Sequence, residues 1–328
     1  MTHGEERAKL AEVFTGIARL ARQGALQTAK KRVEYRSLPT KNLLNRCSAP
    51  SMPFDWTVNP YRGCEFACRY CYARYTHEFM EFHDPLDFET RIFAKDFSPE
   101  SAAAEIRRLP RHHTIALGTA TDPYQPAERQ FGRTRRFLEA FAQMRGRSLA
   151  ITTKGDLIRR DTPLLLEIAQ NNTLSINFSI ATLDLRLARA LEPGAPRPDL
   201  RLAAVESLSR AGLATGVFAS PVLPGLTDGR RLEAVAQAAA ASGARRFGAQ
   251  MLFLKPAAAR VFLPWLEREF PALAPAYRAQ FARAAYLRGE TVARLSETVR
   301  QLRARYHLDA HCLESPAPRQ LVLFPPEK

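Results

Sequence analysis

The feature that most restricts the fold of this chain is a regular alternation of short apolar segments with longer amphipathic ones. Six apolar segments of strand length lie at residues 57–59, 114–118, 148–152, 174–180, 214–220 and 247–254. Between them stand helical patterns such as SPESAAAEIRRL, RTRRFLEAFAQM and DGRRLEAVAQAAAASG. Strands that are each followed by a helix indicate parallel βα units. Six such units predict an α/β fold, a partial (β/α)6 TIM-type barrel that is open on one side.

The flanking segments predict the remaining organisation. Apolar residues at helical spacing in residues 5–23 predict an N-terminal helix, and the basic stretch KKRVEYRSLPTKNLLNR follows it as a linker or arm, which together make a first unit of residues 1–45. The barrel takes residues 46–256, and a helical extension rich in Arg and Ala takes residues 257–310. A Pro-rich tail takes residues 311–328.

Composition narrows the class of protein. The chain has 328 residues, of which 46% are hydrophobic and 25% charged, and no apolar run reaches the ~18–20 residues that a membrane span needs. The start, MTHGEERAKLAEVF, has no apolar signal core. Five cysteines, three of them crowded together, do not form a disulfide framework. We therefore expect a cytoplasmic protein with reduced thiols and no membrane partner.

The net charge of +15 favours a polyanionic partner, most commonly nucleic acid. Contacts from many Arg residues to phosphates would give affinity without sequence preference and with strong salt dependence. The alternative is a basic but merely solvated surface.

The strongest chemical signal is the stretch NPYRGCEFACRYCYAR, in which Cys64, Cys68 and Cys71 have the spacing C-x3-C-x2-C. Three thiolates can each bind one iron of a [4Fe–4S] cluster and leave the fourth iron without a protein ligand. An open coordination position distinguishes a reactive metal centre from a structural one. The loop follows the first predicted strand, so it lies on the face where barrel enzymes carry their chemistry.

Two alternatives compete with the cluster. The first is a zinc ion that His77 or His83 completes, although no second CxxC pair is present. The second is a set of inert buried cysteines, which fits poorly beside the charged residues Arg62, Glu65 and Arg69.

These residues resemble the radical S-adenosylmethionine (SAM) superfamily. Together with TDPYQPAE, TTKGDLIRRD, LEPGAPRPDLRL and SPVLPGLTD, the cysteine stretch resembles the branch related to spore photoproduct lyase, the DNA repair photolyase-like proteins. The resemblance covers about residues 40–265. It implies that the open iron binds SAM, that one electron cleaves the sulfonium, and that the resulting 5′-deoxyadenosyl radical abstracts hydrogen from a substrate. It also implies a reductase such as flavodoxin or ferredoxin as electron donor.

The resemblance also implies roles for individual residues. It makes Cys64, Cys68 and Cys71 the cluster ligands and places the segment SPVLPGLTD against adenine. It implies SAM-binding roles for an aromatic residue, a loop after the second strand, and two residues at strand ends: Tyr70, Thr119, Thr121, Asp122, Lys154 and Ser179. Glu192 and Arg201 belong to the same branch pattern, but chemistry alone assigns them no role.

The chain departs from the lyase pattern at the hydrogen donor. The lyase needs a cysteine after the second strand, and Ala120 or another non-thiol residue nearby stands at that position here. Tyr72 matches a catalytic tyrosine of the lyase's hydrogen-transfer relay. The remaining thiols are Cys47 and Cys312. We therefore expect no efficient repair of spore photoproduct.

The C-terminal stretch RQLVLF resembles the short peptide by which bacterial polymerases and repair factors bind the DNA sliding clamp. Its anchors are Gln320, Leu321, Leu323 and Phe324, and the alternative is a terminal strand that packs on the chain's own barrel.

The favoured hypothesis is a radical SAM enzyme that acts on nucleic acid in DNA repair or base modification. The alternatives are a radical SAM enzyme that acts on a protein or small molecule, and a non-catalytic Fe–S or zinc module that binds DNA.

Overall fold

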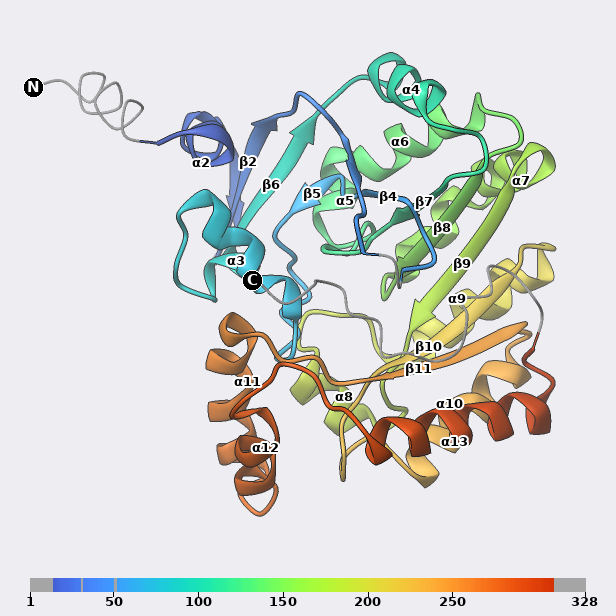
Figure 1. The fold of residues 1–328 in the computed structure, drawn as a ribbon. Coiled ribbons are helices and arrows are strands. Elements are labelled where there is room, and N and C mark those ends of the chain that lie inside the picture. The colour runs from blue at the N-terminus through green and yellow to red at the C-terminus, as the bar shows by residue number, and fades with distance from the viewer. Residues whose placement is uncertain (1–13, 31, 50–51, 310–328) are drawn as a thin grey trace, which may run out of the picture.

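A seven-stranded sheet with the order β11-β10-β9-β8-β7-β4-β3 forms the centre of the computed structural model, which describes residues 14–30, 32–49 and 52–309 (Figure 1). Six of its strands are parallel, and each lies beside the next one in the chain. They are β4 (Trp56–Val58), β7 (Thr114–Leu117), β8 (Ser148–Thr153), β9 (Thr173–Ser179), β10 (Thr215–Val222) and β11 (Arg246–Met251). The predicted α/β class with a parallel sheet is confirmed, and all six predicted strands are present.

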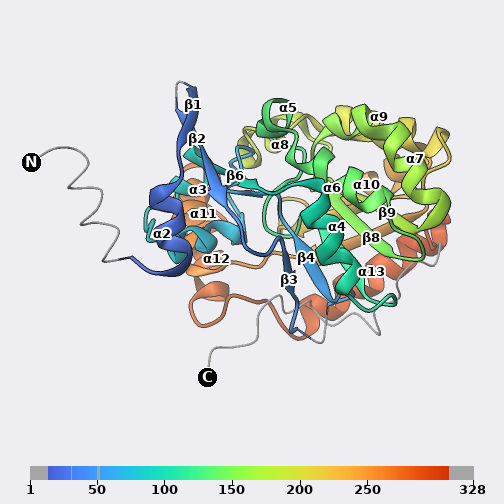
Figure 2. The ribbon, with the colours of Figure 1, turned by 90° about the horizontal axis from the view of Figure 1, so that it is seen from above.

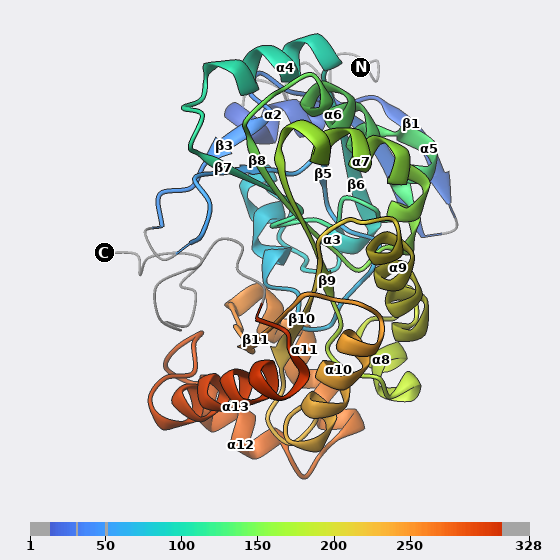
Figure 3. The same cartoon turned by 90° about the vertical axis from the view of Figure 1, so that its right-hand side faces the viewer.

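Helices connect the parallel strands and form a layer along the outside of the sheet (Figure 3). Their bounds are α4 (Pro99–Arg108), α5 (Ala127–Phe131), α6 (Arg133–Ala142), η2 (Asp156–Asp161), α7 (Thr162–Asn171), α8 (Leu185–Leu191), α9 (Pro198–Arg210) and α10 (Arg230–Ala241). Local sequence defines the ends. In α4 the Ser98 side chain accepts the Ser101 amide in a capping box, and a proline occupies the first turn.

The main core lies between this helical layer and the sheet. Large apolar side chains such as Phe141 of α6, Ile151 of β8 and Phe178 of β9 are fully buried in it. Strand β7 is buried at every residue, which explains why such a strand appears in the sequence as a continuous apolar run. The carboxyl ends of these strands are thereby fixed by a rigid core, and the segments that follow them form one edge of the molecule.

A second, four-stranded sheet with the order β1-β2-β6-β5 stands on the other side of the molecule (Figure 2). It consists of β1 (Leu26–Lys30), β2 (Val33–Pro39), β5 (Tyr61–Arg62) and β6 (Arg91–Asp96). The expectation of a basic linker after the first helix is wrong here, because residues 33–39 pair in parallel with β6 along their whole length. The charged side chains of residues 33–39 suggested a linker, but this segment is a strand in which Tyr35 and Leu38 are buried.

The N-terminal helix is present as α2 (Gly16–Gln23), and the first 13 residues lie outside the described ranges. Its Ala21 packs against an apolar cluster that contains Leu38, Met80, Phe82 and Phe93. Helix α2 therefore belongs to the body of the protein and covers the small sheet.

The C-terminal residues form helices as predicted: α11 (Pro256–Glu269), α12 (Ala274–Phe281) and α13 (Glu290–Tyr306). Helix α13 returns to the main sheet, where Arg303 Nε donates to the carbonyl of Phe247 at 2.6 Å. A short strand, β3 (Leu44–Arg46), pairs antiparallel with β4 at the other edge. The four clamp-motif anchors and Cys312 lie outside the described residues.

None of the described helices is long and apolar enough to span a membrane.

Candidate functional site

The cysteine stretch leaves β4 through the two-residue strand β5 and continues into the 3₁₀ helix η1 (Tyr72–Met80) and the short α3 (Asp87–Thr90). Gly63 makes the turn, with φ at +80°. A Cβ atom there would lie 2.7 Å from the Arg91 carbonyl oxygen and 2.9 Å from that of Phe88. The next residue, Cys64, donates its amide to the Phe88 carbonyl at 2.8 Å. The loop can approach α3 and β6 this closely only because the turning residue has no side chain.

Three free thiols gather in this loop, with Cys64 and Cys68 buried and Cys71 half-buried. Burial raises the pKa of each thiol, that of Cys68 to about 12. Cys68 and Cys71 also raise the pKa of Cys64, so the three groups are close enough to interact. Two cations act in the opposite direction: Lys154 lowers the pKa of Cys68 and Cys71, and Arg74 lowers that of Cys71. A bound metal cation would complete this shift, because thiolates are its ligands.

The zinc alternative is not assembled in the described residues. His77 Nε2 lies 2.9 Å from the Arg91 carbonyl oxygen, and its ring packs among Phe82, Phe88 and Phe93. His83 lies at the surface beside Glu81. Residues 14–30, 32–49 and 52–309 contain no group of three or more His, Cys, Asp or Glu that could hold a single metal ion. A cluster does not require such a group, since each thiolate binds a different iron.

Backbone hydrogen bonds attach the cysteine loop to the segment after α8. Arg69 donates its amide to the Leu191 carbonyl at 2.9 Å, and Gly194 donates to the Phe66 carbonyl at 3.1 Å. A Cβ atom on Gly194 would lie 2.1 Å from the Glu65 carbonyl oxygen. The two segments are therefore packed backbone to backbone, and this explains a glycine in LEPGAP.

Gln125, in the segment after β7, holds the loop from another side. Its amide nitrogen donates to the Gly63 carbonyl at 3.0 Å, and its amide oxygen accepts the Glu65 backbone N–H at 3.0 Å. The side chain is fully buried and bridges both sides of Cys64. Sequence reasoning did not identify this residue.

Arg74, in the first turn of η1, anchors the far end of the loop. Its guanidinium donates to the carbonyls of Cys68 at 3.0 Å and Pro85 at 2.7 Å, and it forms an ion pair with Glu89 at 2.6 Å. The side chain is completely buried. Three acceptors thus meet the terminal nitrogens of this charge, and one of them is the carbonyl of a cysteine. The position of Arg74 in CYAR, just after the last cysteine, could have indicated a role in the loop. That pattern does not show that the side chain is buried.

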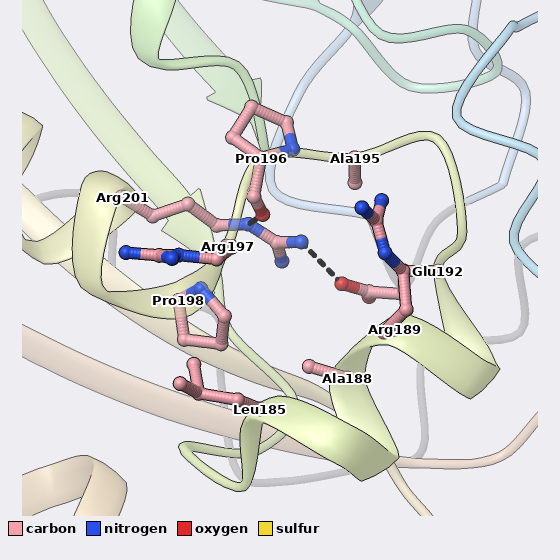
Figure 4. Close-up of a pocket in the computed structure, with 9 residues that line it drawn as sticks. All are labelled: Leu185, Ala188, Arg189, Glu192, Ala195, Pro196, Arg197, Pro198 and Arg201. Atoms are coloured by element: carbon pink, nitrogen blue, oxygen red, sulfur yellow. Dashed lines mark hydrogen bonds and ion pairs between the residues drawn. The ribbon is translucent and has the colours of Figure 1, made fainter.

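The Glu192 carboxylate contacts polar side chains from three parts of the chain next to the cysteine loop. It forms an ion pair with Arg201 of α9 at 2.5 Å, accepts a hydrogen bond from the Tyr70 hydroxyl, and lies 3.9 Å from Lys154 Nζ of the segment after β8. Figure 4 shows the Glu192–Arg201 pair beside a small cavity of about 90 Å³. Burial acts to raise the pKa of Glu192, but Arg201 and Lys154 outweigh it and lower the pKa. Two residues that the sequence left without a role thus connect Tyr70 to α9.

Lys154 follows β8 directly and lies close to the thiols. Burial acts to lower its pKa, but Cys68 and Glu192 outweigh this and raise it, so the ammonium keeps its charge. Its Nζ stands 5.8 Å from the centre of the Tyr70 ring. Ser179 is joined to the same network, because its carbonyl accepts from Arg201 at 2.9 Å while its hydroxyl donates to the Ser220 carbonyl at 3.0 Å.

Asn59 fixes the segment after β7. Its side-chain oxygen accepts the amides of Ala120 at 2.8 Å and Thr121 at 3.2 Å, and its amide nitrogen donates to the Thr119 hydroxyl at 3.2 Å. The Thr121 hydroxyl donates to the Tyr61 carbonyl at 3.2 Å. Both threonine hydroxyls are therefore engaged in holding this loop, and Asn59 is a further residue that sequence reasoning missed.

Asp122 is brought beside the first cysteine. Its carboxylate accepts from the Thr153 hydroxyl at 2.7 Å and from the amides of Lys154 at 2.6 Å and Tyr124 at 2.9 Å. Burial raises the pKa of Asp122, and these three hydrogen bonds oppose the rise. Its charge in turn raises the pKa of Cys64. The carboxylate thus joins the loops after β7 and β8 at the thiols.

Tyr72 donates its hydroxyl to the Thr119 carbonyl, next to Ala120. Its ring centre lies 5.8 Å from that of Phe253. Burial raises the pKa of Tyr72 above its ordinary value. Tyr72 and Ala120 pack against the same apolar cluster as the cysteines, whereas Cys47 follows β3 at the amino end of β4, on the edge of the sheet opposite the loop.

The Glu192→Gln substitution should lower the free energy of unfolding by about 3–5 kcal/mol, because it leaves the buried Arg201 without its counter-charge. Chemical denaturation of both proteins measures the difference. The wild-type contribution is complete above the ordinary glutamate pKa of 4.5 and is lost as the pH falls through the lower folded value.

Asp199→Asn is the matched control, since its pair with Arg197 lies at the surface nearby. It should leave the denaturation midpoint unchanged. Equal effects of the two substitutions would contradict the assignment of Glu192 as a buried anchor.

Comparison with known proteins relates this geometry to a family. Residues 58–238 match the family model described as the Radical SAM superfamily. An uncharacterized protein of Mycobacterium tuberculosis (strain ATCC 25618 / H37Rv) is 38% identical over 296 residues, which cover 89% of this chain and 87% of the relative. An uncharacterized protein of Methanocaldococcus jannaschii is 26% identical over 197 residues, 60% of this chain and 71% of that one.

Among solved structures, spore photoproduct lyase complexed with dinucleoside spore photoproduct has a similar fold. The TM-score is 0.63 at 18% identity, with coverage of 89% of this chain and 83% of that chain. A variant of the same lyase with bound AdoMet and dinucleoside spore photoproduct gives a TM-score of 0.61 at 15% identity, covering 92% of each chain.

Proposed function

The chain belongs to the radical SAM superfamily and is a radical SAM enzyme, and from this premise we propose that Cys64, Cys68 and Cys71 hold a [4Fe–4S] cluster with one iron open to SAM. The observation that carries the proposal is three free thiols on one loop, close enough to interact electrostatically and anchored from three separate elements. When bound, such a cluster supplies the electron that cleaves the sulfonium of SAM. The six parallel strands fit the partial barrel expected for this chemistry.

The residues of this chain provide the setting for that electron transfer. Three thiolates would place negative charge in a buried loop, and the cations of Lys154, Arg74 and Arg201 lie where they would offset it. We infer that Arg74 and Gln125 keep the loop in one conformation whether or not a metal is bound. Fixed geometry around the ligands is what tunes a metal site.

Several residues near the thiols are suited to bind SAM. Lys154 is a charged ammonium beside Cys68 and suits the methionine carboxylate, while Asp122 suits the ammonium group. Tyr70 offers an aromatic face for adenine and Ser179 a hydroxyl for the ribose. Thr119 and Thr121 use their hydroxyls within the protein, so we propose that they contribute mainly by shaping the loop.

We propose nucleic acid as the substrate class, with DNA repair or base modification as the reaction. The net charge of +15 supports a polyanion. The fold similarity to a lyase complexed with a dinucleoside photoproduct supports the same class. We propose a flavodoxin or ferredoxin as the electron donor. We also propose that the C-terminal motif binds the DNA sliding clamp and that the protein is located in the cytoplasm.

Plain reversal of spore photoproduct is not the proposed reaction. Tyr72 stands next to Ala120, where the lyase pattern has a cysteine, and no other described thiol besides the three ligand candidates lies at this edge of the sheet. If a product radical takes back a hydrogen atom here, the donor would be Tyr72 or a group other than a described thiol.

Replacement of any one of Cys64, Cys68 or Cys71 by Ala should abolish cluster incorporation and SAM cleavage, because a cluster with only two protein ligands is not retained. Anaerobic reconstitution followed by iron analysis and measurement of 5′-deoxyadenosine tests this. Wild type should retain about four irons per chain.

Cys47→Ala is the control within the same chain and should match the wild type in both assays. A zinc content of one per chain in anaerobically purified protein, with no 5′-deoxyadenosine formed, would contradict the cluster proposal.

Oligonucleotides labelled with deuterium should transfer label to 5′-deoxyadenosine if nucleic acid is the substrate. Mass spectrometry detects the transfer, and Cys68→Ala supplies the background. Filter binding should show affinity that falls steeply as salt rises. Absence of affinity for single- and double-stranded DNA and RNA at low salt would favour a protein or small-molecule substrate.

Wild-type enzyme should convert dinucleoside spore photoproduct poorly, and Ala120→Cys should increase conversion by placing a thiol beside Tyr72. Product formation per SAM consumed measures the effect, with Ala120→Ser as the control of similar size. Rapid catalytic conversion by the wild type would show that no thiol is needed at this position.

A further inference from the structure

A second cavity, of about 340 Å³, lies between α2, the β2–β3 connection and the adjoining strands β5 and β6. It is separate from the thiols and from the Glu192 network. The charged side chains that line it are all cationic: Arg19, Lys41, Arg62 and Lys95. Amides and a hydroxyl add hydrogen-bonding groups, and no Asp or Glu is among the described lining residues.

Strand register explains why two of these cations point to the same place. Arg62 of β5 stands opposite Phe93 of β6, and Lys95 follows two residues later on the same face. Leu38 of β2 pairs with Lys95 on the other side. Phe93 and Leu38 are fully buried against Ala21 of α2, so the cations lie at the border of an apolar cluster.

Lys95 is buried, at 6% exposure, and it lines the cavity without an ion pair to any carboxylate among the residues that the structure describes. Arg62 Nε is likewise buried without a hydrogen-bond partner. Elsewhere in the described part of the chain, the buried guanidinium groups of Arg74 and Arg201 each meet a carboxylate. Burying a cation without a counter-charge is costly, so an anion from outside would relieve the imbalance.

Glu105 of α4 is the carboxylate that acts on Lys95. Its oxygens, however, accept the amides of Leu43 and Leu44 at 3.0 Å. It is therefore already engaged with the β2–β3 connection and stands behind the lining of the cavity.

We propose that this cavity is a binding site for a phosphate group, with Lys95 and Arg62 at its base and Arg19 and Lys41 at its rim. A phosphate carries up to two charges and presents several acceptor oxygens to such donors. Gly16, the first residue of α2, also lines the cavity, and helix N-termini favour anions. Binding here does not require the cysteine site. The phosphate group could belong to a free anion or to a nucleic acid end, and the experiment separates these sources.

The site should be sensitive to pH. Burial and the charge of Arg62 lower the pKa of Lys95 to about 7, with Glu105 acting in the opposite direction. As the pH rises through this value, the ammonium loses its charge and anion binding weakens. Sulfate is the informative probe because it does not itself titrate between pH 6 and 8.

Thermal denaturation and calorimetry of the full chain test the site at constant ionic strength. Inorganic phosphate and sulfate should raise Tm relative to chloride, with sulfate weaker at pH 8 than at pH 6. Lys95→Met should weaken phosphate binding at least about tenfold. It should also raise the Tm measured without phosphate, by about 2–4 °C, because a buried unpaired charge is gone.

Arg19→Ala is a second, surface variant that keeps the test valid if Lys95→Met does not fold, and it should also weaken phosphate binding. Arg210→Met removes one charge from a remote exposed position and should behave as wild type.

A 5′-phosphorylated dinucleotide compared with its 5′-hydroxyl form separates the sources. Tighter binding of the phosphorylated form than of inorganic phosphate assigns the site to nucleic acid ends, and equal binding assigns it to free phosphate. Failure of both anions to raise Tm above chloride, or equal responses of wild type, Lys95→Met and Arg19→Ala, would overturn the assignment.

Discussion

A buried charge is stable only when an opposite charge lies beside it. This constraint determines how the residues around the cysteine loop are arranged. Glu192 is nearly inaccessible to solvent and meets Arg201 and Lys154, and it also accepts the Tyr70 hydroxyl. Each partner comes from a different part of the chain. The ion pair therefore connects the cysteine loop, the end of β8 and helix α9, and the position of the thiols depends on it.

The same constraint distinguishes the two regions of the molecule. Near the thiols, buried cations have carboxylate partners and lie where three thiolates would add negative charge. Beside α2, Lys95 and Arg62 have no such partner among the described residues. The first arrangement is balanced within the chain and suits the proposed metal cluster, whereas the proposed anion would balance the second.

Sequence patterns predicted the parallel strands well. Strand β7, at Thr114–Leu117 against an expected 114–118, illustrates this, because a strand buried on both faces appears as a continuous apolar run. Strand β2 was missed, since its burial is irregular and its charged residues suggested a linker. The cysteine spacing identified three thiols that the structure brings together in one loop. It could not reveal Gln125 or Asn59, because their contacts join residues about 60 positions apart and depend on the folded chain.

The anchoring of the cysteine loop by Leu191, Glu192 and Gly194 has a consequence for how the protein matures in the cell. A ribosome delivers the three thiols long before it delivers these anchors and Arg201. Until then the nascent chain offers iron only a flexible stretch of cysteines. Loading of the proposed cluster would therefore follow synthesis of most of the chain, and the thiols would be open to oxidation in the interval.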